Sequence, residues 1–283
     1  MKKYFSLITF SHTVFALPFA IIGFSLGISQ PGAEFKWMDL VLVIACMVFA
    51  RSAAMAFNRY IDSDIDKLNK RTEKREIPSG VITKKNAIFF IAFNSVAFII
   101  CAGLLNSLCL ILSPVALLVI LGYSYTKRFT WLCHFILGIG LSLAPIGAYI
   151  AVTETFQILP IIFSLIVFTW VSGFDIIYAL QDEEFDKKNN LYSLPAKLGK
   201  KNAMMVSVII HLITASLIFY SGTYLLFGAW YYLGAGFFTG MLIYQHMIVK
   251  PNDLSRVNRA FFTTNGIASV IFGVFIITDL FIF

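Results

Sequence analysis

Long apolar segments constrain this chain more than any other feature of its sequence. Nine of them reach roughly the length that an α-helix needs to cross a bilayer, about 20 residues, and lie at about 8–28, 37–58, 86–106, 108–125, 132–151, 158–180, 203–222, 226–247 and 261–282. Only 13% of the 283 residues are charged, whereas soluble domains carry about 25%. We therefore predict an all-α, polytopic membrane protein with about nine transmembrane helices.

The basic residues predict how these helices are oriented. With the N-terminus in the cytoplasm, the cytoplasmic segments hold 20 of the 22 Lys and Arg residues, and the opposite loops hold only Lys36. Because cytoplasmic loops are enriched in Lys and Arg, we expect the N-terminus and the two longest loops to be cytoplasmic, with the bacterial inner membrane as the location. Anionic lipid at that surface accounts for the net charge of +7 without any nucleic-acid partner.

The order of the segments suggests an internal repeat within one domain, 1–283. Two weakly similar halves, about 1–128 and 129–250, each place an aspartate-rich loop after the second apolar segment, and a ninth segment follows them. Equivalent positions of two such halves commonly face a shared site in membrane proteins. We therefore expect the two loops to form one site.

The first aspartate-rich loop has a regular spacing of polar side chains. Asn58, Asp62 and Asp66 are four residues apart, so on a continuing helix they share one face. Carboxylates repel at this spacing unless a cation lies between them, and Mg²⁺ is typically held by one or two carboxylates together with substrate phosphates. Arg71 and Arg75 follow, and their guanidinium groups suit phosphate oxygens.

The second loop repeats the pattern after the sixth apolar segment. Asp175, Asp182 and Asp186 share one helical face, and Tyr178 and Gln181 belong to the same run. Glu183 and Glu184 fall off that face and are expected only to be solvated. A single motif of this kind, taken alone, more often belongs to a loop that only faces water. Two motifs, both on the same side and both preceded by buried polar groups, favour a magnesium and substrate site.

Arg51 is the most informative single residue, because arginine inside a membrane span is costly and usually functional. It precedes Asn58 by seven residues and therefore lies on the same helical face, about 10 Å deeper. A guanidinium there can receive a carboxylate bidentately. The alternative is a structural ion pair with Asp175. Near the same level, Lys127 is a candidate diphosphate contact and Tyr123 a candidate for stabilising a cation.

The motifs N-x-x-x-D-x-x-x-D, R-x-x-x-R and Y-x-x-Q-D-x-x-x-D together resemble those of the UbiA-type intramembrane prenyltransferases, over nearly the whole chain. The resemblance implies a helical fold around a central cavity open to lipid, with Mg²⁺ bridging the aspartate motifs and a polyprenyl diphosphate. It implies metal and diphosphate binding by Asn58, Asp62, Asp66, Asp182 and Asp186, and phosphate binding by Arg71, Arg75 and Lys127.

Arg51 and the segments FSHTVFALPFA and DIIYALQDEEFDKKNNLYSLPAKLG are most similar to the 4-hydroxybenzoate branch of that family. This branch implies transfer of a polyprenyl group to a ring carbon of a carboxylated aromatic acid in quinone biosynthesis. The acceptor expected first is 4-hydroxybenzoate, of ubiquinone biosynthesis, and the alternative is a dihydroxynaphthoate, of menaquinone biosynthesis. One departure is Glu76, which stands where the family often has proline after the arginine that matches Arg75.

Other functions fit the residues less well. Arg51 and Asp175 suit an ion or proton transporter, but the side opposite the acidic loops offers almost no acids, so no path through the membrane is evident. A membrane transferase acting on CDP-alcohols would need glycines beside its aspartates. The expected partners are polyprenyl diphosphate, an aromatic acid and membrane lipid, without an obligate protein partner.

Overall fold

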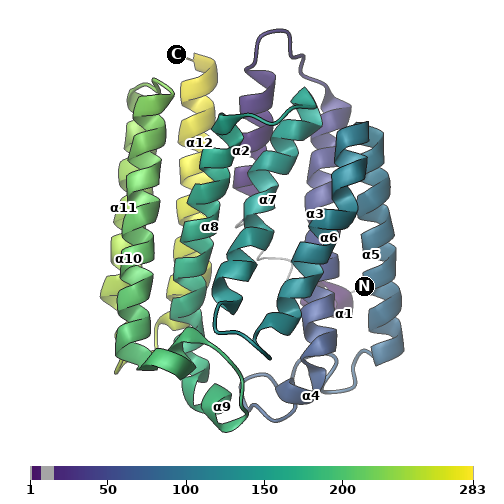
Figure 1. Cartoon of the computed structure of the whole chain (residues 1–283), viewed down its shortest axis with the longest axis vertical. Helices are drawn as coiled ribbons and strands as arrows, with labels where there is room; N and C mark the ends of the chain where they lie inside the picture. Colours follow the sequence, from purple (N-terminus) through teal and green to yellow (C-terminus); the bar gives the residue numbers. More distant parts are fainter. Residues whose placement is uncertain (1, 8–15, 283) are drawn as a thin grey trace.

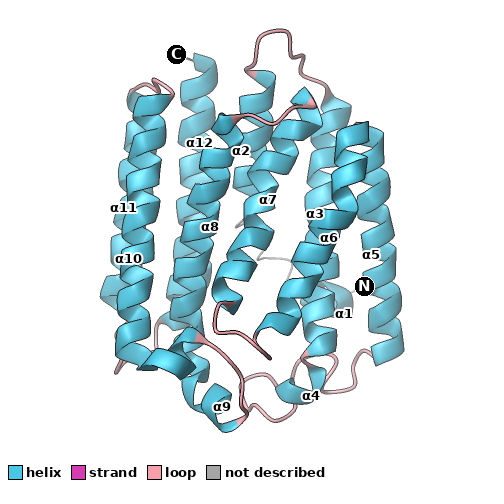
Figure 2. Cartoon of the chain, viewed as in Figure 1, coloured by secondary structure: helices cyan, strands magenta, loops and turns pink. Residues whose placement is uncertain are grey.

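The protein is a bundle of long helices that run between two opposite ends (Figure 1). The computed structural model describes residues 2–7 and 16–282, and Figure 2 shows these helices joined by loops at the two ends of the bundle. Nine helices form the bundle in the described ranges: α2 (Leu17–Ile28), α3 (Trp37–Ile61), α5 (Lys84–Leu105), α6 (Ser107–Thr126), α7 (Cys133–Thr153), α8 (Ile158–Ala179), α10 (Leu194–Tyr224), α11 (Ala229–Ile248) and α12 (Asn265–Ile282).

Each predicted apolar segment falls on one of these nine helices, although the start of the first segment, residues 8–15, lies outside the described residues. Seven helices in the described part of the chain are long and apolar enough to span a membrane. The other two are α2, with 12 described residues, and α11, which carries Gln245 and His246 in its last turn. The prediction of an all-helical integral membrane protein is confirmed.

Short elements gather at one end of the bundle. There α1 (Lys2–Leu7), α4 (Ser63–Asp66), the 3₁₀ turn η2 (Leu180–Asp182) and α9 (Glu183–Lys188) join or flank the long helices. At the other end, Asn106 alone separates α5 from α6, and its side-chain oxygen accepts from Cys109 N at 2.8 Å. This cap satisfies an amide that the first turn of α6 leaves free. Because a single residue connects them, α5 and α6 are antiparallel neighbours, as predicted.

The hydrophobic core is centred on α8. Trp170 lies between Phe19 of α2 and Phe238 of α11, with ring centroids 5.2 and 5.4 Å away. The α2–α7 contact is close because Gly23 lies against the backbone of Pro145, where a Cβ would collide with the Pro145 carbonyl group. By contrast, α3, α5 and α6 have few buried side chains, so they form the looser side of the bundle.

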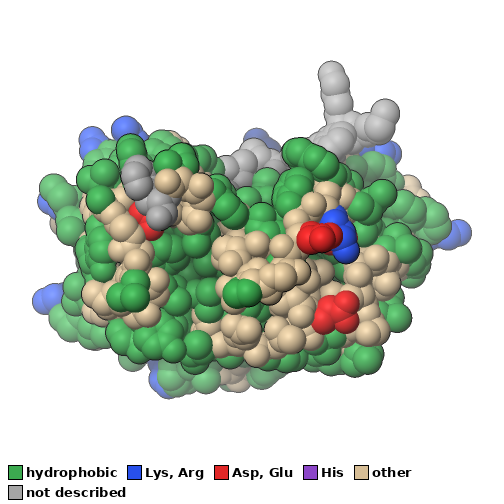
Figure 3. All heavy atoms as spheres, turned by 90° about the horizontal axis from the view of Figure 1, so that it is seen from above, with side chains coloured by type: hydrophobic (Ala, Val, Ile, Leu, Met, Phe, Trp, Pro, Cys, Tyr) green, Lys and Arg blue, Asp and Glu red, His purple; other side chains and the backbone are tan. Residues whose placement is uncertain are grey.

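The two ends differ in charge. The end opposite α4 and α9 is mostly apolar and backbone surface with few charged side chains (Figure 3). The C-terminus lies at that end (Figure 1), whereas α1 packs at the α4 end, where Leu7 joins Ile77 and Ile82 in a small core. The acidic loops therefore lie together at the polar end of the bundle.

Candidate active site

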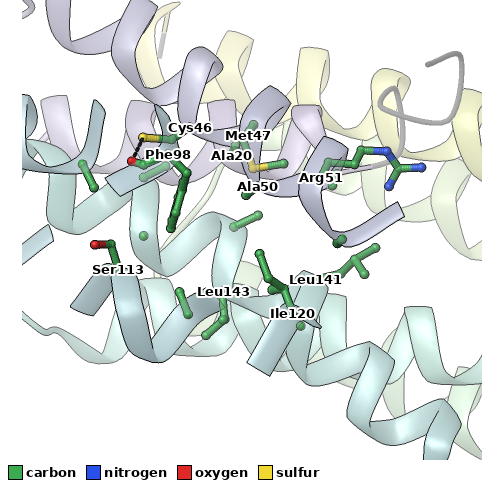
Figure 4. A pocket seen from close by; sticks show the side chains of 18 of the residues that line it. Ala20, Cys46, Met47, Ala50, Arg51, Phe98, Ser113, Ile120, Leu141 and Leu143 are labelled. Atoms are coloured by element: carbon green, nitrogen blue, oxygen red, sulfur yellow. Dashed lines mark hydrogen bonds between the residues drawn. The ribbon is translucent and has the colours of Figure 1, made fainter. Parts of the chain in front are cut away.

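An apolar cavity of about 220 Å³ lies within the looser side of the bundle. Residues of α2, α3, α5, α6 and α7 line it, and many of them are small, such as Ala50, Ala144 and Gly140. Figure 4 shows Cys46, Met47, Ala50 and Arg51 following one another along α3 beside it. The cavity is therefore built mainly from the first half of the chain and from α7.

Arg51 and Tyr123 are the polar residues at one end of this cavity, and they interact electrostatically. The Arg51 Nε atom is buried and has no hydrogen-bond partner among the described residues. No ion pair joins Arg51 to Asp175 in the described ranges, so the alternative of a structural pair between them is not what the structure contains. A cation in an apolar cavity with an unpartnered buried nitrogen is costly, and Arg51 therefore provides a position for an anionic ligand.

The first aspartate motif begins where α3 ends. The helix does not continue unbroken through the motif, since it stops at Ile61 and Asp62 caps it before α4. Asn58 still donates to Asp62, at 3.3 Å. Two cations from the end of α6 hold the same carboxylate, Lys127 Nζ at 2.7 Å and Arg128 Nη2 at 2.9 Å. The Asp62 side chain is thus buried and doubly paired.

An arginine from the loop after α4 connects the two motifs. Arg71 donates to both carboxylate oxygens of Asp182, at 3.1 Å from Nε and 2.6 Å from Nη2, and its Nη1 donates to the Tyr178 hydroxyl at 3.1 Å. Arg75 holds Asp66 with distances of 2.8 and 2.9 Å from one nitrogen to the two oxygens. The predicted meeting of the two loops is therefore present in the structure.

The remaining two aspartates have neutral or histidine partners. Asp186 is buried and accepts from the Ser193 hydroxyl at 2.8 Å. Asp175 lies 2.7 Å from Nδ1 of His134. Asp175, Asp62 and Arg51 all influence the electrostatics of Tyr123, so Asp175 lies in the neighbourhood of this lining residue, although it does not itself line the cavity.

Asp62, Asp66 and Asp182 are paired with basic side chains and do not form a metal cage with the other carboxylates. Among the described residues, no group of three or more His, Cys, Asp or Glu side chains is placed to hold a metal ion. The donor set nevertheless fits Mg²⁺, because Asp62, Asp66, Asp182 and Asp186 offer hard oxygen ligands at one end of the bundle.

Several polar contacts at the site are not evident from spacing. The arginine spacing suggested phosphate contacts for Arg71 and Arg75 but not their present pairs with aspartates, and Asn69, which donates to Asp182 at 3.2 Å, belongs to no helical pattern. The interpretation of Glu183 as only solvated is wrong: it lies 2.6 Å from Lys187 and 3.8 Å from Lys200. Lys200 comes from α10, beyond the reach of local periodicity.

The chain resembles known proteins over most of its length. The model of the UbiA prenyltransferase family matches residues 16–267. A 4-hydroxybenzoate octaprenyltransferase from Nitrosomonas europaea is 32% identical over 244 residues, covering 86% of this chain and 83% of the relative.

Two solved structures show the same arrangement of helices. A UbiA homologue from Aeropyrum pernix superposes with a TM-score of 0.86 at 33% identity, covering 95% of this chain and 98% of that one. A UbiA homologue from Archaeoglobus fulgidus, bound to DMAPP and Mg²⁺, gives a TM-score of 0.73 at 20% identity and covers 99% and 100% of the two chains.

The family match spans most of the chain, and the nine-helix bundle with two aspartate loops at one end agrees with it. This integral membrane protein therefore belongs to the UbiA prenyltransferase family and is a prenyltransferase.

Proposed function

We propose that this prenyltransferase moves a polyprenyl group from polyprenyl diphosphate to a ring carbon of a carboxylated aromatic acid, with 4-hydroxybenzoate as the acceptor. The observation that carries the proposal is Arg51, a partly buried cation at the end of an apolar cavity, whose buried Nε has no partner and which forms no ion pair among the described residues. A guanidinium of this kind suits a carboxylate. The similarity to 4-hydroxybenzoate octaprenyltransferases supports the same acceptor.

The aspartates and the basic side chains around them are proposed to bind the diphosphate. Mg²⁺, held by Asp62, Asp66, Asp182 and Asp186 with Asn58, would neutralise charge on the leaving diphosphate. Arg71, Arg75 and Lys127 would donate to phosphate oxygens, which is the interaction that guanidinium and ammonium groups favour.

The transfer step follows from charge and geometry. The bond between the first prenyl carbon and oxygen breaks, and diphosphate leaves with the electron pair. The ring carbon ortho to the acceptor hydroxyl forms a bond to the allylic cation, which the face of Tyr123 at the end of the cavity stabilises. The proton on that ring carbon passes to the Asp175 carboxylate, which restores the aromatic ring. Arg51 fixes which ring carbon faces the cation.

The size of the cavity fits the acceptor and the reacting end of the donor. Sites for drug-sized ligands occupy roughly 300–1,000 Å³, and this cavity of about 220 Å³ is smaller. A long polyprenyl chain therefore extends beyond it, along the lipid-facing surfaces of α3, α5 and α6.

Replacement of Arg51 tests whether this residue binds the carboxylate of the acceptor. Arg51→Ala is expected to raise the KM for 4-hydroxybenzoate by about 30-fold or more, since losing one partner of a buried charged pair costs roughly 2–5 kcal/mol. The KM for the prenyl donor should stay close to that of the unmodified protein. Both constants are measured with purified protein in detergent.

The matched control is Cys46→Ala, which changes the same face of α3 and the same cavity without removing a charge. It should leave both constants near their original values. Phenol, which lacks the carboxylate, should be a poor acceptor for the unmodified protein. Equal losses for donor and acceptor in Arg51→Ala, or efficient prenylation of phenol, would contradict the role of Arg51.

A further inference from the structure

His134 has contacts that fix both of its ring nitrogens. It lies in the first turn of α7 and is only 3% exposed. The backbone N–H of Leu194 donates to its Nε2 at 3.3 Å. Because an amide N–H can only donate, Nε2 carries the lone pair and the neutral ring bears its proton on Nδ1. That nitrogen lies 2.7 Å from Oδ2 of Asp175, so His134 is a donor to the carboxylate.

The start of α10 connects this pair with the second aspartate motif. Ser193 caps the helix by accepting from Ala196 N at 3.3 Å, and its hydroxyl also donates to Asp186 at 2.8 Å. The backbone N–H of its neighbour Leu194 donates to Nε2 of His134. Two consecutive residues thus fix Asp186 directly and Asp175 through the imidazole, so the positions of these carboxylates depend on one rigid segment.

We propose that His134 is a positioning residue for Asp175, an inference that rests on the proposed function. The imidazole holds Oδ2 and leaves Oδ1 for the proton released from the ring, since Asp175 makes no other hydrogen bond within the described residues. His134 does not itself receive that proton, because the Leu194 amide occupies its second nitrogen. Its contribution is to hold the carboxylate in one orientation in the neighbourhood of Tyr123.

A comparison of His134→Gln with His134→Leu distinguishes positioning of Asp175 from simple packing. The amide of His134→Gln can donate to Asp175 and accept from the Leu194 N–H, whereas His134→Leu fills similar space with neither group. We expect His134→Leu to lower kcat by at least about tenfold, which is part of the roughly 10²–10⁴-fold that a positioned acid–base group contributes. The KM values for donor and acceptor should change less than about twofold, and His134→Gln should recover most of the rate.

A double variant checks that the effect passes through Asp175. On an Asp175→Asn background, His134→Leu should cause little further loss, because residues that act together are not additive. His134→Met replaces the leucine variant if that variant does not yield folded protein. The inference is overturned if His134→Leu retains the original kcat, if Gln and Leu lose activity equally, or if the two losses multiply. Failure of the proposed function is distinct, since the unmodified protein would then prenylate no carboxylated acceptor.

Discussion

At the scale of residues, the site keeps its acids neutralised by cations that are also suited to phosphate. Asp62 is 2% exposed and Asp66 is 4% exposed, and burying such carboxylates without partners would cost several kcal/mol each. Lys127, Arg128 and Arg75 prevent that cost. Burial acts to lower the pKa of Arg71, but the adjacent Asp182 and Tyr178 raise it above its ordinary value, so this guanidinium stays charged.

Two aspartates of the same loop provide a matched test of this arrangement. Asp62→Asn should lower turnover by at least about 100-fold, because it removes a proposed metal ligand and leaves Lys127 and Arg128 beside a neutral amide. The control is Asp64→Asn, since the Asp64 side chain is 76% exposed and contacts only Lys84 among the described residues. Rates are compared at saturating substrates. A variant Asp62→Asn with the original rate would refute the metal assignment.

Sequence spacing predicted the aspartates and their surroundings better than it predicted their partners. The four-residue repeats identified Asp62, Asp66, Asp182 and Asp186, and the two loops do meet. Periodicity cannot show that Arg71 reaches across to Asp182, or that His134 binds Asp175, because these contacts join residues 111 and 41 positions apart. Such contacts depend on how helices pack, which local spacing does not encode.

At the scale of elements, both motifs lie where a long helix breaks. α3 ends at Ile61 and is followed by α4, and α8 ends at Ala179 and is followed by η2 and α9. The apolar segments predicted most helices to within a few residues. The exception is the start of α10, where a short turn over residues 194–198 precedes a break at Gly199, whose φ of 79° is not helical. The long part of the helix begins after this break, a few residues before the predicted start at 203.

The close contact between α2 and α7 yields a stability prediction. Gly23→Ala should lower the thermal midpoint of the purified protein by several degrees, since its Cβ would overlap the Pro145 carbonyl and overpacking costs about 1–3 kcal/mol. Gly236→Ala on α11 is the control, because no atom lies within 4 Å of the added carbon there. An unchanged midpoint for Gly23→Ala would show that the two helices separate without penalty.

At the scale of the whole molecule, charge and function concentrate at one end. The aspartate loops and α1 lie there, and the opposite end has few charged side chains (Figure 3). We propose that this polar end is cytoplasmic, as the distribution of Lys and Arg predicts. We also propose that the chain is one domain of two halves, about 1–128 and 129–250, with α12 added.

Labelling of single cysteines tests the orientation. On a background without the four native cysteines, Glu34→Cys should react with a membrane-impermeant maleimide in intact cells, since it lies in the loop between α2 and α3 at the sparsely charged end. Lys70→Cys, in the exposed loop after α4, should react only after the membrane is permeabilised. The reverse labelling pattern would show that the polar end faces away from the cytoplasm.

Transfer of the prenyl group under metal control tests the central claim most directly. Purified protein is incubated in detergent with polyprenyl diphosphate and 4-hydroxybenzoate, with Mg²⁺ or with EDTA, and the product is identified by mass spectrometry. We predict prenylated 4-hydroxybenzoate only with Mg²⁺. If only a dihydroxynaphthoate were prenylated, the proposed reaction would stand and the acceptor would be that acid in place of 4-hydroxybenzoate. Equal product with EDTA, or no prenylation of either acid, would contradict the account.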